Sequence, residues 1–289
     1  RKGDHFITSS YEHPAILNVA NELHGKGVDV SYIKPNSFGL IDPDDIKSKI
    51  NSKTKLISIM YVNNELGTIN PIKKIGKIAK ENNILFHTDA VQMIGKGKIN
   101  LKSQNIDLLS LSAHKFYGPK GVGALYVKDG VNLKATYFGG GQEKNLKPGT
   151  ENVSGIHGMS IALKKSIKEL PLWLKTVNQY EELFIKGLEK SKIKFIINGK
   201  DRVSGILNIT FTDILSSDLV MGLDMRGYAI SGGSACSSGS IKPSGVLKEI
   251  GLTDDMALRT VRISFGKNLT KKNILELSES ISKIITNQN

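Results

Sequence analysis

Short apolar runs alternate with amphipathic stretches along the first part of the chain. The runs are rich in isoleucine, leucine and valine, as expected of parallel strands that are covered on both faces. Strands are predicted at residues 5–9, 28–33, 56–62, 84–88, 108–112 and 124–127, and helices at 14–24, 42–51 and 71–81. In the helix over 71–81, Ile72, Ile75 and Ile78 form one apolar stripe. Strand–helix–strand alternation at this spacing predicts βαβ units and a mostly parallel sheet flanked by helices.

The pattern changes after residue 127. A glycine-rich loop at 139–141 is followed by predicted helices from about residue 154, over 172–188, near 216–226 and at the C-terminal end, and by strands at 194–197, 205–211 and 261–265. In the helix over 172–188, large residues share one face: Trp173, Val177, Tyr180 and Phe184. We therefore expect an α/β fold with a large domain over 1–168 and a smaller α+β domain over 169–289, joined by a helix.

Composition narrows the classes of protein further. The 289 residues are 39% hydrophobic, which is enough for a sizeable core. No apolar run approaches the roughly 20 residues that span a bilayer, and the opening residues lack the apolar region of a signal peptide. The net charge is +13, but the lysines are spread along the chain, which favours a solvated basic surface over a nucleic-acid site. We expect neither a membrane nor a nucleic-acid partner.

The single cysteine, Cys236, excludes an internal disulfide and any intrinsic metal site built from cysteines. It also indicates a reducing, cytoplasmic setting. Cys236 lies in AISGGSACSSGS, and a run of small and polar residues of this kind predicts a mobile, exposed loop. An exposed thiol in a chain that otherwise avoids cysteine suggests a reactive group.

The densest candidate chemistry follows the predicted strand at 108–112. Ser112, His114 and Lys115 lie where the strand ends and a turn begins, and the carboxyl ends of strands are where α/β sheets bind ligands. Partial burial there would lower the pKa of the Lys115 amine, which could then attack an aldehyde. A surface lysine in a loop is the alternative interpretation.

Asp89 and Gln92 follow the strand predicted at 84–88. A buried carboxylate at a strand end needs a cation or several hydrogen bonds, and the protonated pyridine nitrogen of pyridoxal phosphate would be such a cation. Asp89 could instead cap the segment that follows it. These two roles compete for one side chain.

Polar residues also mark other strand ends. His13 precedes a predicted helix and could stack on a flat heterocycle or move protons, or simply end the helix. Asn64 lies in VNNELG, directly after another strand. Near the C-terminus, Arg262 in RTVRISFG could clamp a carboxylate with two hydrogen bonds, and so could its neighbour Arg259.

In chain order, these segments resemble those of the cysteine desulfurases, pyridoxal-phosphate enzymes of the aminotransferase class V family. The motifs that carry the resemblance are EHPAIL, VNNELG, HTDAVQ, SAHKFYGPKG, GGGQEKNLKPGT, GILNITF, SGGSACSSGS and VRISFG. They cover essentially the whole chain and imply the type I fold of pyridoxal-phosphate-dependent transferases. The segment around Cys236 is similar to the cysteine loop of the NifS/IscS type.

The resemblance implies a role for each candidate residue. Lys115 would bind pyridoxal 5′-phosphate covalently, Asp89 would pair with its pyridinium nitrogen, and Gln92 would bond its ring hydroxyl. The phosphate would be held by Ser112 and His114, and by Thr150 of a partner subunit in a homodimer.

For the substrate, the resemblance implies that Asn64 and Arg262 orient the carboxylate of L-cysteine, with Asn64 also near the cofactor. His13 would stack on the ring and take part in catalysis. The thiolate of Cys236 would attack the substrate sulfur, which leaves a persulfide on the enzyme and releases L-alanine. The sulfur would pass to an acceptor such as an iron–sulfur scaffold protein, and Cys236 could itself be a transient iron–sulfur ligand.

Three alternatives stay open at this point. Selenocysteine lyase uses the same cofactor and a related substrate. An aminotransferase or kynureninase-like activity would leave Cys236 without a purpose. Family members also carry a preceding segment with a glycine–alanine–threonine phosphate-binding loop at a helix N-terminus. We expect this chain to lack that part of the fold and to bind the cofactor more weakly, and a non-catalytic remnant acting by protein interaction is the third alternative.

Overall fold

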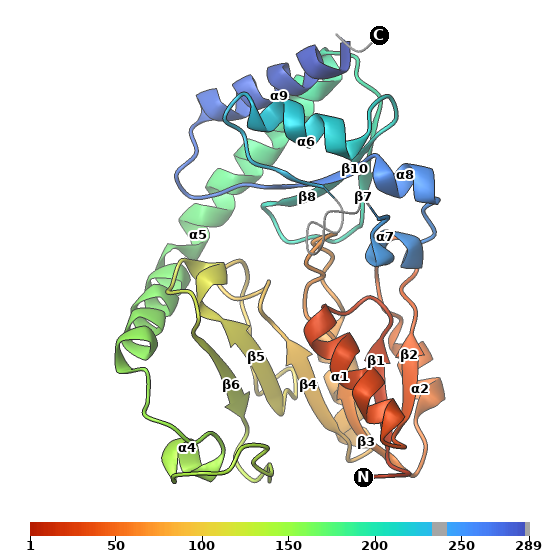
Figure 1. The fold of residues 1–289 in the computed structure, drawn as a ribbon, viewed down its shortest axis with the longest axis vertical. Helices are drawn as coiled ribbons and strands as arrows, with labels where there is room; N and C mark the ends of the chain where they lie inside the picture. The colour runs from red at the N-terminus through yellow and green to blue at the C-terminus, as the bar shows by residue number, and fades with distance from the viewer. Residues whose placement is uncertain (233–241, 287–289) are drawn as a thin grey trace.

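The computed structural model describes residues 1–232 and 242–286, which form two β-sheets connected by a long helix (Figure 1). The larger sheet has the order β2-β1-β3-β4-β5-β6. Its strands are β1 His5–Ser9, β2 Asp29–Ile33, β3 Thr54–Ser58, β4 Leu85–Asp89, β5 Leu108–Ser112 and β6 Gly123–Val127. Neighbours pair in parallel except β6, which runs antiparallel to β5. The mostly parallel sheet predicted from the sequence is therefore confirmed.

The helices between these strands are α1 Pro14–Gly25, α2 Pro43–Lys49 and α3 Ile72–Glu81, close to their predicted positions. On α3 the apolar stripe faces the core, with Ile72 and Ile75 buried. The strand predicted over 56–62 ends earlier, at Ser58. Beyond it the Met60 N–H donates to the Glu12 carboxyl at 2.8 Å, so a side chain takes the place of a neighbouring strand.

The connecting helix, α5, runs unbroken from Val153 to Lys190. The sequence predicts two helices here, and the structure shows that they are one, with Pro171 inside it. The predicted face is buried: Trp173, Val177, Tyr180 and Phe184 all lie in the core. The predicted domain division between residues 168 and 169 falls inside α5 and stays a prediction.

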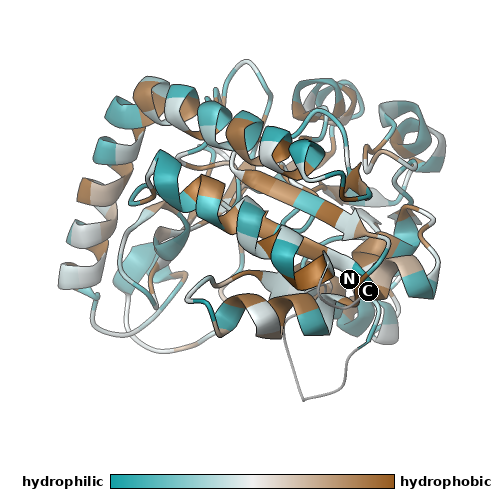
Figure 2. Cartoon of the chain, turned by 90° about the horizontal axis from the view of Figure 1, so that it is seen from above, coloured by the Kyte–Doolittle hydropathy of each residue, from teal (hydrophilic) through white to brown (hydrophobic). Residues whose placement is uncertain are grey.

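The second sheet has the order β7-β8-β10-β9 and is antiparallel. Its strands are β7 Phe195–Asn198, β8 Ile206–Phe211, β9 Ser231–Gly232 and β10 Thr260–Ser264. Helices α6 Ser216–Asp224 and α9 Lys271–Thr286 pack against each other near the C-terminal part of α5 (Figure 1). The helices are banded with apolar and polar residues (Figure 2), as amphipathic helices are.

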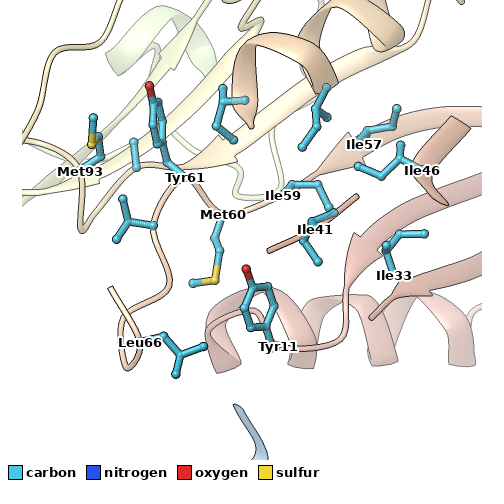
Figure 3. Packing of buried hydrophobic residues seen from close by; sticks show 14 of the residues in the cluster. Tyr11, Ile33, Ile41, Ile46, Ile57, Ile59, Met60, Tyr61, Leu66 and Met93 are labelled. Atoms are coloured by element: carbon cyan, nitrogen blue, oxygen red, sulfur yellow. The ribbon is translucent and has the colours of Figure 1, made fainter. Parts of the chain in front are cut away.

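Four short elements complete the described chain: the 3-10 helix η1 Ala113–Phe116, α4 Gln142–Asn145, α7 Gly245–Glu249 and α8 Asp254–Leu258. The sequence pattern predicts none of them. One core cluster joins strands of the larger sheet to α2 and α3, and it includes Tyr11, Met60 and Leu66 (Figure 3). It also contains Val246 and Leu247 of α7, so the C-terminal part of the chain packs directly on the larger sheet. No helix in the described part of the chain is long and apolar enough to cross a bilayer.

Candidate active site

The candidate residues follow the carboxyl ends of neighbouring strands of the larger sheet. His13 comes after β1, Asp89 ends β4, and Ser112 ends β5. Because β1, β3, β4 and β5 are parallel, these ends share one edge of the sheet. Segments from the C-terminal part of the chain reach this edge, since Arg262 of β10 donates from Nη1 to the Asn64 carbonyl oxygen at 3.0 Å.

Asp89 is largely buried, and burial raises the pKa of its carboxyl. Its Oδ1 accepts a hydrogen bond from the Val91 N–H at 2.9 Å, and the nearby charge of His13 also acts to lower the pKa of Asp89. The other carboxyl oxygen accepts no hydrogen bond from the described residues. The two competing roles are thus divided: one oxygen caps the following turn, and the second is left for a ligand.

Gln92 lies in that turn and is 9% exposed. Its amide oxygen, Oε1, accepts from the Nζ of Lys96 at 3.0 Å, and its backbone carbonyl accepts from the same amine at 3.2 Å. Burial, and then the charges of Lys115 and Arg262, lower the pKa of Lys96 to about 8. Lys96 therefore lies near two candidate residues, Lys115 on η1 and Arg262 on β10.

The turn after β5 holds Ser112, His114 and Lys115. The Ser112 Oγ and the His114 Nδ1 are hydrogen-bonded at 2.8 Å, so these two candidate phosphate ligands lie side by side. Lys115 is exposed on η1. The sequence leaves two interpretations open for Lys115, a partly buried amine and a surface lysine in a loop, and in the described structure Lys115 is a surface lysine. The desolvated amine of this region belongs to Lys96.

Arg262 is held in the site rather than in solvent. Its Nη2 donates to the Ser231 Oγ at 3.3 Å, while its Nε is buried and has no partner among the described residues. Arg259, the alternative carboxylate clamp, is occupied elsewhere: its Nε bonds both carboxyl oxygens of Asp255 at 3.0 Å. The structure therefore favours Arg262 over Arg259 as a clamp.

His13 begins α1 as its N-cap, and its Nδ1 accepts from the Ala15 N–H at 3.1 Å. It is exposed, and its charge reaches Asp89. The helix-end role considered for His13 is thus real, and the exposed ring still lies beside the buried carboxyl. Asn64 contributes its carbonyl oxygen to Arg262, and its side chain makes no hydrogen bond to the described residues.

Two predicted residues do not join this group in the described structure. Thr150 is exposed between α4 and α5, and no hydrogen bond links it to the other candidates. Cys236 lies outside the described residues.

Two residues near the site were missed by the sequence prediction. Glu12 is 2% exposed, and burial raises its pKa to about 8. Its Oε1 accepts from the Ser9 Oγ at 2.6 Å and from the Met60 N–H. Its Oε2 has no partner among the described residues. The charge of Asp89 also raises the pKa of Glu12. Lys96 is the second. The strand-end rule that selects Asp89 also applies to Glu12, three residues after β1, whereas no sequence signal separates Lys96 from the other lysines.

These residues fit pyridoxal phosphate. A desolvated carboxyl with one free oxygen suits a pyridinium nitrogen, adjacent hydroxyl and imidazole groups suit a phosphate, and the reachable amine of Lys115 suits an aldehyde. The buried, unpartnered Nε of Arg262 suits a carboxylate. Among the described residues, no group of three or more His, Cys, Asp or Glu side chains could hold a metal ion.

Comparison with known proteins gives a consistent picture. The family model of the class-V aminotransferases matches residues 1–277. The chain is 44% identical over 289 residues to the cysteine desulfurase IscS of Clostridium botulinum (strain Hall), covering 99% of this chain and 73% of that protein. A solved NifS-like protein superposes with a TM-score of 0.91 at 33% identity, covering 99% of this chain and 76% of its own. The structure described as SspA in complex with cysteine gives a TM-score of 0.76 at 39% identity, covering 91% and 73%.

Proposed function

This chain belongs to the class-V aminotransferase family, which depends on pyridoxal phosphate, and we propose that it is a cysteine desulfurase that converts L-cysteine to L-alanine. The observation that carries the proposal is the Asp89 carboxyl, desolvated and with one oxygen free, on the strand next to the one that leads to Lys115. Curated relatives named cysteine desulfurase, and a solved relative described with bound cysteine, support the substrate.

Each group has a task in holding the cofactor. Lys115 offers an exposed amine to the aldehyde, and the free oxygen of Asp89 keeps a proton on the pyridine nitrogen. Ser112 and His114 donate to the phosphate, Gln92 donates to the ring oxygen, and His13 covers the ring. When bound, pyridoxal phosphate supplies an electron sink for the pair left when the substrate Cα loses a proton.

Arg262 binds the substrate carboxylate, and Asn64 completes that contact. Two nitrogens of Arg262 are fixed by Asn64 and Ser231, so the guanidinium is oriented before substrate arrives. Its Nε has no other partner among the described residues, and a substrate carboxylate would satisfy it.

Sulfur transfer is assigned to Cys236, on the basis of the sequence. Its thiolate forms an S–S bond with the substrate sulfur while the Cβ–S bond breaks. The electron pair of the broken bond stays on Cβ, which takes up a proton to become the methyl group of alanine. L-cysteine and the enzyme thiol thus give L-alanine and an enzyme persulfide, with no external oxidant. A sulfur-acceptor protein such as an iron–sulfur scaffold, in the cytoplasm, would take the persulfide sulfur.

We include a homodimer in the proposal. Thr150 is exposed and makes no hydrogen bond to the other candidate residues within the described ranges, which suits a residue that reaches the phosphate site of a partner subunit.

The test adds pyridoxal phosphate to the purified chain and follows the visible absorbance that remains after free cofactor is removed. We expect bound absorbance in the wild type, its loss in Lys115→Ala, and its retention in the matched control Lys120→Ala, an exposed lysine five residues further on. A wild-type chain that stays colourless would refute the proposal and favour the non-catalytic remnant.

Product analysis then tests the reaction. L-cysteine should give alanine and, with a thiol present, sulfide, while Cys236→Ser should keep the visible absorbance and lose sulfide release. Sulfide formation by Cys236→Ser would exclude the persulfide route. Selenide release from L-selenocysteine, without sulfide release from L-cysteine, would identify a selenocysteine lyase instead.

A further inference from the structure

Lys96 lies in the turn that connects β4 to the following segment, beside the proposed cofactor residues. The turn packs closely on η1, because a Cβ added at Gly95 would meet the Phe116 Cβ at 3.0 Å. Phe116 follows Lys115 directly, so this contact brings the Lys96 turn next to the proposed cofactor lysine. The charges that act on Lys96 are those of Lys115 on η1 and Arg262 on β10.

The contact between Lys96 and Gln92 fixes which way the Gln92 amide points. A lysine ammonium only donates hydrogen bonds, so the amide atom 3.0 Å from the Lys96 Nζ must be the oxygen. Flipping the amide would place two donors against each other. The Gln92 Nε2 therefore points away from Lys96, and it donates to none of the described residues.

We propose that Lys96 is a positioning residue that holds the Gln92 amide with its Nε2 directed at the ring oxygen of pyridoxal phosphate. The inference rests on the proposed function, and it adds a residue that acts through Gln92. The ring oxygen carries negative charge when the cofactor is joined to Lys115, so it needs a donor, and the opposite amide orientation would present an acceptor to it.

A positioned donor has a spectroscopic consequence. The proton on the nitrogen that links Lys115 to the cofactor is held partly by the charged ring oxygen. A hydrogen bond from the Gln92 Nε2 to the ring oxygen reduces the attraction of that oxygen for the proton. The nitrogen of the linkage therefore loses its proton at a lower pH. Loss of the positioning contact should raise that pH midpoint, which is visible as a change of absorbance.

The experiment titrates the visible absorbance of the pyridoxal-phosphate-loaded protein with pH and measures the dissociation constant of pyridoxal phosphate. For Lys96→Met we expect the pH midpoint of the absorbance change to rise by about one unit, which is about a tenfold change in the proton equilibrium constant. We also expect the dissociation constant of pyridoxal phosphate to increase. Lys96→Arg, which keeps a cationic donor, should restore most of the wild-type midpoint. The matched control is Lys98→Met, which removes an exposed lysine two residues further on and should leave the midpoint unchanged.

A double-mutant cycle tests whether Lys96 acts through Gln92. In the Gln92→Ala background, the amide that Lys96 positions is gone. Lys96→Met should then change the proton equilibrium constant, measured from the pH midpoint, by less than about twofold. Equal effects of Lys96→Met in both backgrounds would overturn the positioning role, and so would an unchanged midpoint in Lys96→Met alone. A wild-type protein that binds no pyridoxal phosphate would instead refute the proposed function, so the two failures are distinct.

Discussion

The buried acid Glu12 gives a quantitative test of the electrostatics beside the site. Burial raises the pKa of Glu12 from its ordinary value of 4.5 to about 8 in the folded chain. Between these values the unfolded carboxyl is ionised while the folded one keeps its proton. The folded state then binds more protons than the unfolded state, so the free energy of unfolding decreases as pH rises, by about 1.4 kcal/mol per pH unit. From about pH 5.5 to about pH 7.5 the loss is about 3 kcal/mol.

Glu12→Gln removes this titration and keeps most of the contacts. The Ser9 Oγ and the Met60 N–H both donate to Oε1, which glutamine retains. The new amide nitrogen replaces Oε2, which has no partner among the described residues, so an unpaired buried N–H costs about 1 kcal/mol or more. We expect the variant to be less stable than the wild type at about pH 5.5 and to equal or exceed it at about pH 7.5.

The assay is urea unfolding of both proteins at several pH values between these limits. The difference between variant and wild type should change by about 3 kcal/mol, because the titrations of all other groups cancel in it. Glu182→Gln, which removes an exposed carboxylate from α5, is the matched control and should show a small, constant difference. A pH-independent difference for Glu12→Gln would show that the carboxyl ionises alike in both states, and the reasoning would fail.

Two further predictions concern packing and a buried imidazole. Gly76→Ala should destabilise the chain by about 1–3 kcal/mol in urea unfolding, because the new Cβ would lie 2.0 Å from the Gln104 carbonyl oxygen. The control is Gly245→Ala, where the new Cβ meets open space, and it should change stability by less than about 0.5 kcal/mol. Burial lowers the pKa of His87 to about 4, so the contribution of this imidazole to stability decreases as pH falls from about 6.5 towards 4. The free energy of unfolding of His87→Gln relative to the wild type should therefore increase as pH falls over this range, and a pH-independent difference in urea unfolding would contradict the prediction.

The strands of the larger sheet are the part of the fold that the sequence predicts best, since most of them are short apolar runs that end in polar residues. The error at 56–62 has a local cause. Residues 59–62 are as apolar and as buried as a strand, but β1 ends at Ser9 and no longer runs beside them. The Met60 N–H bonds the Glu12 carboxyl, distant in sequence, and the Met60 carbonyl oxygen accepts from the Asn70 side-chain amide. A hydrophobic pattern predicts which residues are buried. It does not predict which neighbouring groups form hydrogen bonds with their backbone.

The unbroken α5 has a similar explanation. Proline usually ends a helix because it lacks an N–H and crowds the carbonyl four residues earlier. At Pro171 that carbonyl belongs to Ile167, which is 62% exposed and therefore lies on the solvent-facing side of the helix. Leu170 and Trp173 on either side are buried in the core, and their packing favours a continuous helix. Tertiary contacts of this kind are invisible to local propensity.

For the site, the position of polar residues at strand ends selects Asp89, Gln92 and Ser112 from the sequence. The fold places Asp89 and Ser112 at the ends of adjacent strands and Gln92 in the turn after Asp89. A position at a strand end does not predict contacts made across the chain. Arg262 reaches the Asn64 carbonyl from a position 198 residues away, and only the fold distinguishes it from Arg259. Exposure is equally a property of the fold: the sequence leaves open whether the Lys115 amine is partly buried or a surface group, and the structure exposes Lys115 and partly buries Lys96.

Glu12 and Asp89 are two desolvated carboxyls near the site whose surroundings differ. Burial raises the pKa of both, and the charge of Asp89 adds to the rise in the pKa of Glu12. The charged form of Asp89 is favoured by the Val91 N–H and by the charge of His13, whereas Glu12 is more deeply buried and its charged form is favoured by hydrogen bonds from the neutral Ser9 hydroxyl and Met60 N–H. With its pKa raised to about 8, Glu12 keeps its proton at pH 7, whereas the Val91 N–H and the charge of His13 act against the rise in the pKa of Asp89. A neutral Glu12 can accept hydrogen bonds from Ser9 and Met60 and so stabilise the turn before His13. Because it is neutral, it does not compete with Asp89 for the pyridinium nitrogen of the cofactor.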